Sequence, residues 1–382
     1  MSVYERFALI FACFAYIGLP LCFLALCALL WLYDPLQVWH KPYFRDISFL
    51  DETRLQNKGI IKYYDFNSFV LGSSMLRNTS AKEASMKLNG KWVNISMDSS
   101  AFNERAVVLT YLFKHKKVSQ ILYSLDGHRW QGGANTKNFD FLYDDGEFND
   151  IKIYFNRKTI LCALRLSTSD KCVGRDKDLE ILTNWTRETW NSARFGGFHK
   201  WLENKDNEQL KDTLQQLQAI AKSQKIPLYS ETTFNKSIKE SQEMLEKNIL
   251  SFVRKHPETK FYFVFPTYSR LSYRLQPAEF LAKTKIVLKW LLKQSQNLPN
   301  MKIYAFDDLN YADEIANYKD LAHYNVDMNS MQIDAIANGT HILTPENIDE
   351  YLQTMENKIK AYDLAPLIRE IKEWEKNQND KK

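Results

Sequence analysis

The stretch DFNSFVLGSS, residues 65–74, is a short apolar run that ends in a Gly-Ser-Ser turn. Its middle, Ser68–Leu71, has the composition and length of a buried β-strand, and Gly72 allows a sharp bend where that strand ends. Further short apolar runs follow along the chain, and helical patterns separate them. Strands that alternate with helices at this spacing predict a parallel sheet with helices on both faces, which is a three-layer α/β fold.

The other predicted elements continue this alternation. The expected strands are Trp92–Ile95, Val118–Leu125, Lys260–Pro266 and Lys302–Phe306. The expected helices are Ala81–Leu88 with Ser80 as N-cap, Asn103–His115, Pro277–Gln296, Met328–Asn338 and Pro345–Trp374. The alternation pauses from about 127 to 240, where the sequence is rich in Asn, Trp and charge. We expect this stretch, with a weaker helical signal at 208–225, to be an insertion that caps the sheet.

An uncharged run, Phe7–Tyr33, precedes the sheet. As a helix it would be roughly 40 Å long, enough to cross a ~30 Å hydrocarbon core. The run is longer than the apolar region of a signal peptide and shows no small-x-small cleavage site, so we expect an uncleaved transmembrane anchor. A buried core helix is the alternative, and the length of the run without a polar break argues against it.

These patterns define the predicted boundaries. The anchor occupies residues 1–33, an irregular neck 34–64, the α/β domain 65–351 with its insertion at about 127–240, and a C-terminal helix and tail 352–382. Charge alone leaves the orientation of the anchor open, because Arg6 lies on one side of it and Lys41 and Arg45 lie on the other.

Composition and charge argue against several classes of function. The net charge of +5 is modest for 382 residues and forms no basic block, so no nucleic-acid partner is expected. The seven His are scattered and no metal-ligand spacing occurs, so neither a metal site nor a cofactor is expected. Beyond the anchor, the sequence has only Cys162 and Cys172, which favours a disulfide in an oxidising compartment over two unrelated buried thiols.

Two short motifs place reactive side chains after predicted strands. Ser74 follows the first strand, where open parallel sheets bind ligands and where the N–H groups of a turn can stabilise an oxyanion. Asp320-Leu321-Ala322-His323 follows the last strand. A carboxylate three positions before a histidine can fix the tautomer that deprotonates a serine. Each motif alone is common as a turn or a surface pair, but their placement together favours a site made of Ser74, His323 and Asp320.

These motifs resemble the SGNH/GDSL hydrolase superfamily, whose fold is flavodoxin-like. Its Gly-Asp-Ser nucleophile turn corresponds to Gly72-Ser73-Ser74, which makes Ser74 the nucleophile, and its Asp-x-x-His block corresponds to Asp320 and His323. The stretches FVLGSSMLRNTSAKEA, NISMDSSAFNE and HYNVDMNSMQIDAIANGTHILTPENIDEYL are similar to a branch that has one N-terminal helix and acts on surface polysaccharides. That branch includes the D-alanyl transfer protein of teichoic acid and the alginate acetylation proteins. The resemblance covers residues 65–351 without the insertion.

The expected oxyanion hole departs from the family pattern. Ser73 replaces the usual Asp, and the stretch NISMDSSAF lacks the glycine whose N–H normally serves there. At the third block Asp126 replaces the usual Asn, and an ionised carboxylate only accepts hydrogen bonds. The remaining candidates are the backbone N–H groups of Ser74, Met97, Asp98 and Ser99 and the side chains of His128, Arg129 and Asn135.

The resemblance implies a serine acyltransferase or esterase that acts on a cell-envelope polysaccharide, with His323 as the base and Asp320 orienting it. Such chemistry would place the body in the periplasm or at the cell exterior, on a single-pass protein of the inner membrane. The expected partners are the lipid bilayer, an envelope glycan and a membrane-bound O-acyltransferase. The alternative is a non-catalytic relative that binds a glycan or assembles with that enzyme, and the incomplete oxyanion hole favours this alternative.

The region of the insertion also contains several tryptophans, at positions 130, 185, 190 and 201. They could form a platform on which sugar rings stack. We expect them rather to pack the insertion's own small core, because buried Trp is common.

Overall fold

The computed structural model describes residues 3–126, 130, 132–180, 188–221 and 231–379. The chain forms two compact units. The first, which we name the anchor unit, comprises residues 1–65, 110–115 and 136–178. The second, which we name the sheet unit, comprises residues 66–109, 116–135 and 179–382.

The sheet unit contains an all-parallel sheet, so the predicted α/β class is confirmed. In the described part of the chain its five strands are β1 (Ser68–Leu71), β2 (Trp92–Asn94), β3 (Gln120–Ser124), β4 (Lys260–Val264) and β5 (Met301–Tyr304), in the spatial order β2-β1-β3-β4-β5. Ser68 pairs with Trp92 on one side and with Gln120 on the other. Every residue of β1 is buried, as expected for a strand that is covered on both faces.

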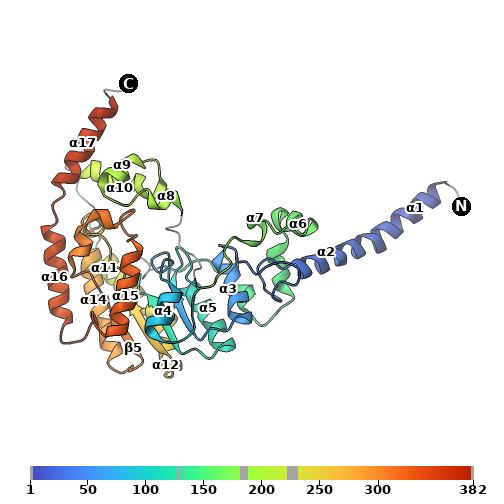
Figure 1. Ribbon diagram of the computed structural model, residues 1–382, viewed down its shortest axis with the longest axis horizontal. Coiled ribbons are helices and arrows are strands. Elements are labelled where there is room, and N and C mark those ends of the chain that lie inside the picture. The colour runs from blue at the N-terminus through green and yellow to red at the C-terminus, as the bar shows by residue number, and fades with distance from the viewer. Residues whose placement is uncertain (1–2, 127–129, 131, 181–187, 222–230, 380–382) are drawn as a thin grey trace. The chain divides into compact units, whose positions relative to one another are not determined.

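Helices cover both faces of this sheet (Figure 1). The main ones are α4 (Ala81–Leu88), α5 (Phe102–His115), α11 (Glu231–Leu245), α14 (Ala278–Ser295), α15 (Val326–Asn338) and α16 (Ile348–Ala361). Because parallel crossovers are right-handed, this strand order puts α4 on one face and α5, α11 and α14 on the other, and contact with α4 puts α15, which follows the last strand, on the face of α4. Contacts between α11 and α14 agree with that arrangement.

The anchor unit begins with a continuous helix, made of α1 (Val3–Cys13), a π-helical turn (Phe14–Gly18) and α2 (Leu19–Tyr33). It is long and apolar enough to cross a membrane. The widened turn lies just before Pro20, which has no N–H to donate to the turn that precedes it. The C-terminal end of α2 packs into a small core formed by Leu30, Tyr33, Leu36, Val38, Tyr154, Cys162, Ala163 and Val173.

The remaining elements of the anchor unit are short. They are α3 (Thr53–Tyr63), two 3-10 turns (Asp140–Tyr143 and Asn149–Tyr154), α6 (Arg157–Leu164) and α7 (Asp170–Val173). Cys162 and Cys172 form a disulfide that joins α6 to α7, with Cα atoms 5.7 Å apart. This is the pairing expected from the sequence. Helix α3 lies within the stretch 34–64 that we expected to be an irregular neck.

Two further expectations differ from the structure. The region 127–240 does not fold as one insertion, because residues 136–178 belong to the anchor unit and those from 179 onward to the sheet unit. The expected helix Pro345–Trp374 is two helices, α16 and α17 (Ala365–Asn379). Pro366 lies in the first turn of α17, where its missing N–H is tolerated, whereas inside a longer helix it would break a hydrogen bond.

The remaining helices of the sheet unit are α8 (Thr189–Ser192), α9 (Phe198–Glu203), α10 (Glu208–Ala221), α12 (Ser251–Lys255) and α13 (Arg270–Arg274).

Candidate active site

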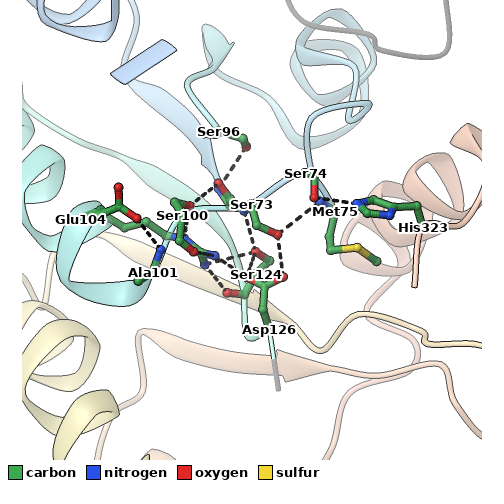
Figure 2. A network of polar contacts seen from close by, with 12 residues as sticks. Ser73, Ser74, Met75, Ser96, Ser100, Ala101, Glu104, Ser124, Asp126 and His323 are labelled. Carbon is green, nitrogen blue, oxygen red and sulfur yellow. Dashed lines mark hydrogen bonds and ion pairs between the residues drawn. The ribbon is translucent and has the colours of Figure 1, made fainter. Parts of the chain in front are cut away.

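The turn after β1 points its two serines in different directions (Figure 2). A glycine is required at position 72, because a Cβ there would lie 2.6 Å from Ser124 Oγ. Ser73 is buried, and its N–H donates to the same Ser124 oxygen at 3.2 Å. Ser74 is partly exposed, and its hydroxyl points toward His323. The turn therefore directs one serine into the interior and the other toward His323.

The side chains of Ser74, His323 and Asp320 form a hydrogen-bonded chain. Ser74 Oγ lies 2.7 Å from Nε2 of His323. The other ring nitrogen, Nδ1, lies 2.8 Å from each carboxylate oxygen of Asp320. Asp320 is buried, while 17% of the His323 side chain stays exposed. These distances fall within the ~2.6–3.2 Å that a nucleophile, its base and an orienting acid require.

Electrostatics fix the direction of these hydrogen bonds. Burial alone would raise the pKa of Asp320, but the charge and hydrogen bonds of His323 and the charge of Lys319 hold that pKa well below its usual range. The carboxylate also accepts the backbone N–H groups of Ala322 and His323, both at 3.0 Å. Because an ionised carboxylate only accepts, Nδ1 of His323 carries the proton and Nε2 accepts from the Ser74 hydroxyl.

Buried polar side chains that follow His323 hold the two halves of the site together. The Tyr324 hydroxyl and the Asn329 amide both donate to the carbonyl of Met75, each at 3.0 Å. Gln332 in turn donates to the Tyr324 hydroxyl at 3.0 Å. The segment that begins α15 is thus tied to the main chain of the nucleophile turn, which sets the position of one relative to the other.

A buried ion pair between Arg105 and Asp126 supports the Gly72–Ser74 turn. Figure 2 shows Asp126 beside Ser73 and Ser124. Asp126 also accepts the hydroxyls of Ser73 and Ser124, each at 2.8 Å. Ser73 Oγ accepts the N–H of Met75 at 3.3 Å. The carboxylate of Asp126 is therefore engaged in holding Ser73 and its turn, and it donates nothing to an oxyanion.

The expected oxyanion donors differ in their exposure and in the hydrogen bonds they already make. Met97 donates its N–H to the carbonyl of Gly72 at 2.8 Å, which removes it from consideration. Asp98 and Ser99 are exposed on the turn after β2, and Ser99 has a φ of 54°, in the left-handed region that favours glycine. Asn135 is exposed beside Ala134, whose N–H and carbonyl bond the side chain of Asn103. His128 and Arg129 lie outside the described residues.

A cationic cluster adjoins Asp320. Lys319 and Arg194 both donate to the side-chain carbonyl of Asn191, at 2.8 and 2.7 Å. Burial, opposed by the charge of Asp320 and reinforced by that of Arg194, lowers the pKa of Lys319 to about 8. The two cations lie 5.9 and 5.3 Å from the ring centroid of Trp190, whose side chain is 55% exposed. Positive charge and an exposed aromatic ring therefore lie near the orienting acid.

Of the other tryptophans that the structure describes in this region, Trp130 and Trp201 are fully buried, as expected, but not in a core of the insertion's own. The ring of Trp130 lies 5.8 Å from that of Phe265, and Trp201 Nε1 donates to the carbonyl of Tyr318 at 3.1 Å. Trp185 lies outside the described residues. Among the residues that the structure describes, no group of three His, Cys, Asp or Glu side chains could hold a metal ion.

Several residues of the site were not identified from the sequence, namely Arg105, Asn191, Arg194, Lys319, Tyr324 and Asn329. A signal for one of them existed in α15. Asn329 and Gln332 are buried polar residues on the helix face that also carries Met328, Ile333 and Ile336. Polar residues that interrupt an apolar face need partners, and here those partners belong to the site.

In comparisons with known proteins, neither a protein-family model nor a curated protein matches this chain.

Proposed function

We propose that this chain is an SGNH-like serine acyltransferase or esterase. The observation that carries the proposal is the hydrogen-bonded chain Ser74–His323–Asp320, with the nucleophile on the turn that leaves a central strand of a parallel sheet. The five-stranded parallel sheet in the described part of the chain, and the Gly-Ser-Ser turn after its first strand, support the resemblance to that superfamily.

The proposed reaction has two halves. Ser74 Oγ attacks the carbonyl carbon of an acyl donor, and its proton moves to Nε2 of His323. The tetrahedral intermediate collapses to an acyl-Ser74 ester, and the leaving group takes that proton from the imidazolium. A sugar hydroxyl or water then gives its proton to His323 and attacks the ester carbonyl. The second tetrahedral intermediate collapses, Ser74 Oγ leaves and takes that proton back from the imidazolium, and the acylated sugar or the free acid is released. Asp320 stays ionised throughout and stabilises the imidazolium that forms twice.

Main-chain N–H groups are the proposed oxyanion donors. The N–H of Ser74 and those of the Asp98–Ser99 turn follow neighbouring strands, β1 and β2. Ser99 adopts a left-handed conformation, so the turn keeps a glycine-like backbone although the sequence has no glycine there. A backbone donor does not depend on the side chain that carries it, so the replacement of the family's glycine does not by itself prevent catalysis, and these main-chain groups would act without the side-chain donor that the family's Asn supplies.

The proposed acceptor is a hydroxyl of a cell-envelope polysaccharide. Trp190 offers an aromatic face for a sugar ring, and Lys319 and Arg194 add positive potential that suits an anionic glycan. The apolar helix Val3–Tyr33 fits a signal anchor. It would hold the protein in the inner membrane with its body in the periplasm or at the cell exterior, and a membrane-bound O-acyltransferase would be its partner.

Acylation of Ser74 is the direct test. The full-length protein in detergent micelles is incubated with p-nitrophenyl acetate, quenched in acid and mapped by peptide mass spectrometry. An acetyl group is expected on Ser74, and none in the Ser74→Ala variant. Ser73→Ala is the matched control, since Ser73 directs its hydroxyl to Asp126 and not to His323, so this variant should still be acetylated at Ser74. A folded protein that acquires no acetyl group on Ser74 would contradict the proposal.

The second candidate function is a non-catalytic partner in glycan acylation. One observation favours it: Asp126, at the position of the family's oxyanion Asn, is bound by Arg105, Ser73 and Ser124 and only accepts hydrogen bonds. In that case Ser74→Ala would leave glycan acylation in cells intact, while deletion of the whole chain would abolish it.

A further inference from the structure

Helix α6 and its flanks expose apolar side chains beside the apolar N-terminal helix. Within the anchor unit α6 packs against α2 (Figure 1). The ring of Phe155, just before α6, stacks on the ring of Phe23 in α2, with centroids 5.8 Å apart and planes 5° from parallel. We name four exposed side chains the α6 surface: Phe155 (41% exposed), Leu161 (41%), Leu164 (62%) and Leu166 (47%).

The position of Phe23 along the helix identifies what covers this surface. Glu5 and Arg6 are the last charges before the apolar run, so the hydrocarbon region begins near Phe7. A ~30 Å hydrocarbon core takes about 20 residues of helix at 1.5 Å each, which reaches about Leu26. Phe23 precedes that border by three residues (26 − 23), or about 5 Å. A tilted helix needs more residues to cross, which would place Phe23 deeper still.

Burial along the helix agrees with this border. Residues 19–25 of α2 are exposed in the structure, and partial burial by the anchor unit begins at Leu26. Phe155 therefore meets the helix on the lipid side of the point at which the protein core takes over. A side chain that stacks on Phe23 lies at the boundary between acyl chains and headgroups, the depth to which interfacial helices bury their apolar face.

The polar residues of α6 fit the same surroundings. Asn156 caps the helix by accepting the N–H of Thr159 at 2.9 Å. Arg157, Lys158 and Arg165 are exposed, and the stretch RKTILCALR, 157–165, contains no acid. Exposed leucines interleaved with Arg and Lys are typical of segments that lie in the interface of membranes with anionic lipids.

We propose that the α6 surface is embedded in the interface of the bilayer and fixes the anchor unit against the membrane. The proposal rests on the membrane anchor of the proposed function but not on its chemistry. The inward side of α6 supports the assignment, because Cys162 and Ala163 are buried in the core that holds α2. The disulfide from Cys162 to Cys172 ties both ends of the segment that carries Leu164 and Leu166. The apolar side chains are thus presented by a fixed segment and not by a free loop.

Photo-crosslinking of the full-length chain tests this. The photoreactive residue p-benzoylphenylalanine replaces Leu161 or Leu164, and the protein is placed in nanodiscs of phosphatidylethanolamine and phosphatidylglycerol. Phe14, within the part of the apolar helix that would cross the hydrocarbon core, is the positive control. Ile286 is the matched negative control: it is 41% exposed, like Leu161, but lies on α14 between Lys285 and Lys289, which pair with Glu356 and Asp349.

Lipid adducts are expected at positions 14, 161 and 164, with at least about tenfold less at 286. Adducts at 14 without adducts at 161 and 164 would overturn the proposal and leave the anchor intact. No adduct at 14 would remove the anchor and the proposal with it. Equal labelling at 286, or crosslinks from 164 to a second copy of the chain instead of lipid, would also overturn it. The variant Arg157→Gln/Lys158→Gln/Arg165→Gln should lose a preference of about twofold or more for phosphatidylglycerol among the adducts.

Discussion

Ser74 Oγ lies 2.7 Å from Nε2 of His323, although 249 positions separate the two residues in the chain. Two kinds of structure bring them together. The parallel sheet collects the carboxyl ends of its strands at one edge, and buried hydrogen bonds from Tyr324 and Asn329 then fix the carbonyl of Met75 next to the serine. The arrangement is specific enough to predict what individual substitutions do.

Removal of either reacting group should abolish acyl transfer or ester hydrolysis. Ser74→Ala and His323→Ala should each lower kcat by about 10³-fold or more, because the nucleophile and its base act as one unit. The double variant should be little worse than either single variant, for the same reason. Steady-state kinetics with p-nitrophenyl acetate measure all three. Losses that multiply in the double variant would show that the two side chains act independently.

Asp320→Asn should keep the site assembled but lose most of its rate. The amide oxygen can still accept the N–H groups of Ala322 and His323, so the loop is preserved. The amide cannot stabilise an imidazolium as an ionised carboxylate does, and the loss in kcat should approach the ~10⁴-fold seen for the equivalent change in a serine protease. The thermal midpoint should move little. A variant with nearly full activity would show that Asp320 does not orient His323.

The parts of the site that are set by the ends of strands and helices could be predicted from the sequence, because local residues mark those ends. The end of the first strand at Leu71 and the bounds of helix Ala81–Leu88 were expected as the structure has them, because Gly72 ends the strand and Ser80 caps the helix. The three side chains Ser74, Asp320 and His323 were expected together because motif spacing and strand order both place them. The groups that hold them, such as Arg105 and Asn191, come from distant segments, and no local pattern marks them.

The helix α3 shows why other elements were missed. Its buried face is largely polar and includes Gln56, Asn57 and Lys58. These side chains are satisfied by distant groups: Gln56 donates to the carbonyl of Leu36 at 2.8 Å, and Lys58 pairs with buried Asp150. Hydrophobic periodicity cannot reveal a helix whose inner face is polar. By contrast, Pro366 in the sequence does signal the break between α16 and α17.

The ion pair between Arg105 and Asp126 should matter for stability as much as for rate. Arg105→Met or Asp126→Asn leaves a buried charge without its partner and should cost about 3–5 kcal/mol. The double variant Arg105→Met/Asp126→Leu should cost less than the sum of the two single variants. Urea unfolding of the full chain in detergent measures these values.

An exposed pair provides the comparison. Lys200 and Glu203 lie 2.8 Å apart with side chains 38% and 57% exposed. Lys200→Met/Glu203→Gln should change the free energy of unfolding by less than about 1 kcal/mol. Equal costs for the buried and the exposed pair would contradict the role assigned to Arg105 and Asp126.

The apolar helix should keep the protein in the membrane. After alkaline carbonate washing the chain should remain in the membrane fraction with its N-terminus intact, because the run Phe7–Tyr33 has no charge. Phe14→Arg, near the middle of the part of the run that would cross the hydrocarbon core, about residues 7–26, should cost about 3 kcal/mol of insertion free energy and raise the soluble fraction. Immunoblots of the fractions and N-terminal sequencing check both. A mature form that begins near residue 30 would identify the run as a cleaved signal.

Asp307 should make the protein less stable as the pH rises from 5 to 8. This carboxyl follows β5 and is fully buried, with the hydroxyls of Tyr273 and Tyr351 at 3.4 and 3.3 Å. Burial raises its pKa to about 7, although the charge of Arg270 and the two hydroxyls oppose the shift. A group whose pKa is higher in the folded state than in the unfolded chain favours folding while it is protonated, and that contribution is lost as the pH rises through the folded-state pKa.

Asp307→Asn removes this proton linkage and keeps the shape of the side chain. Between pH 5 and pH 8 the wild type should lose about 2–3 kcal/mol more unfolding free energy than the variant, given an unfolded pKa near 4 and a folded pKa near 7. Urea unfolding at both pH values, in the same detergent, measures the difference. Asp308→Asn is the control, since it removes a neighbouring carboxylate but leaves Asp307 buried, and most of the pH effect should survive in it. If the wild type and Asp307→Asn lose equal stability over this range, Asp307 is ionised in the folded protein at both pH values, and its burial has been offset by its partners.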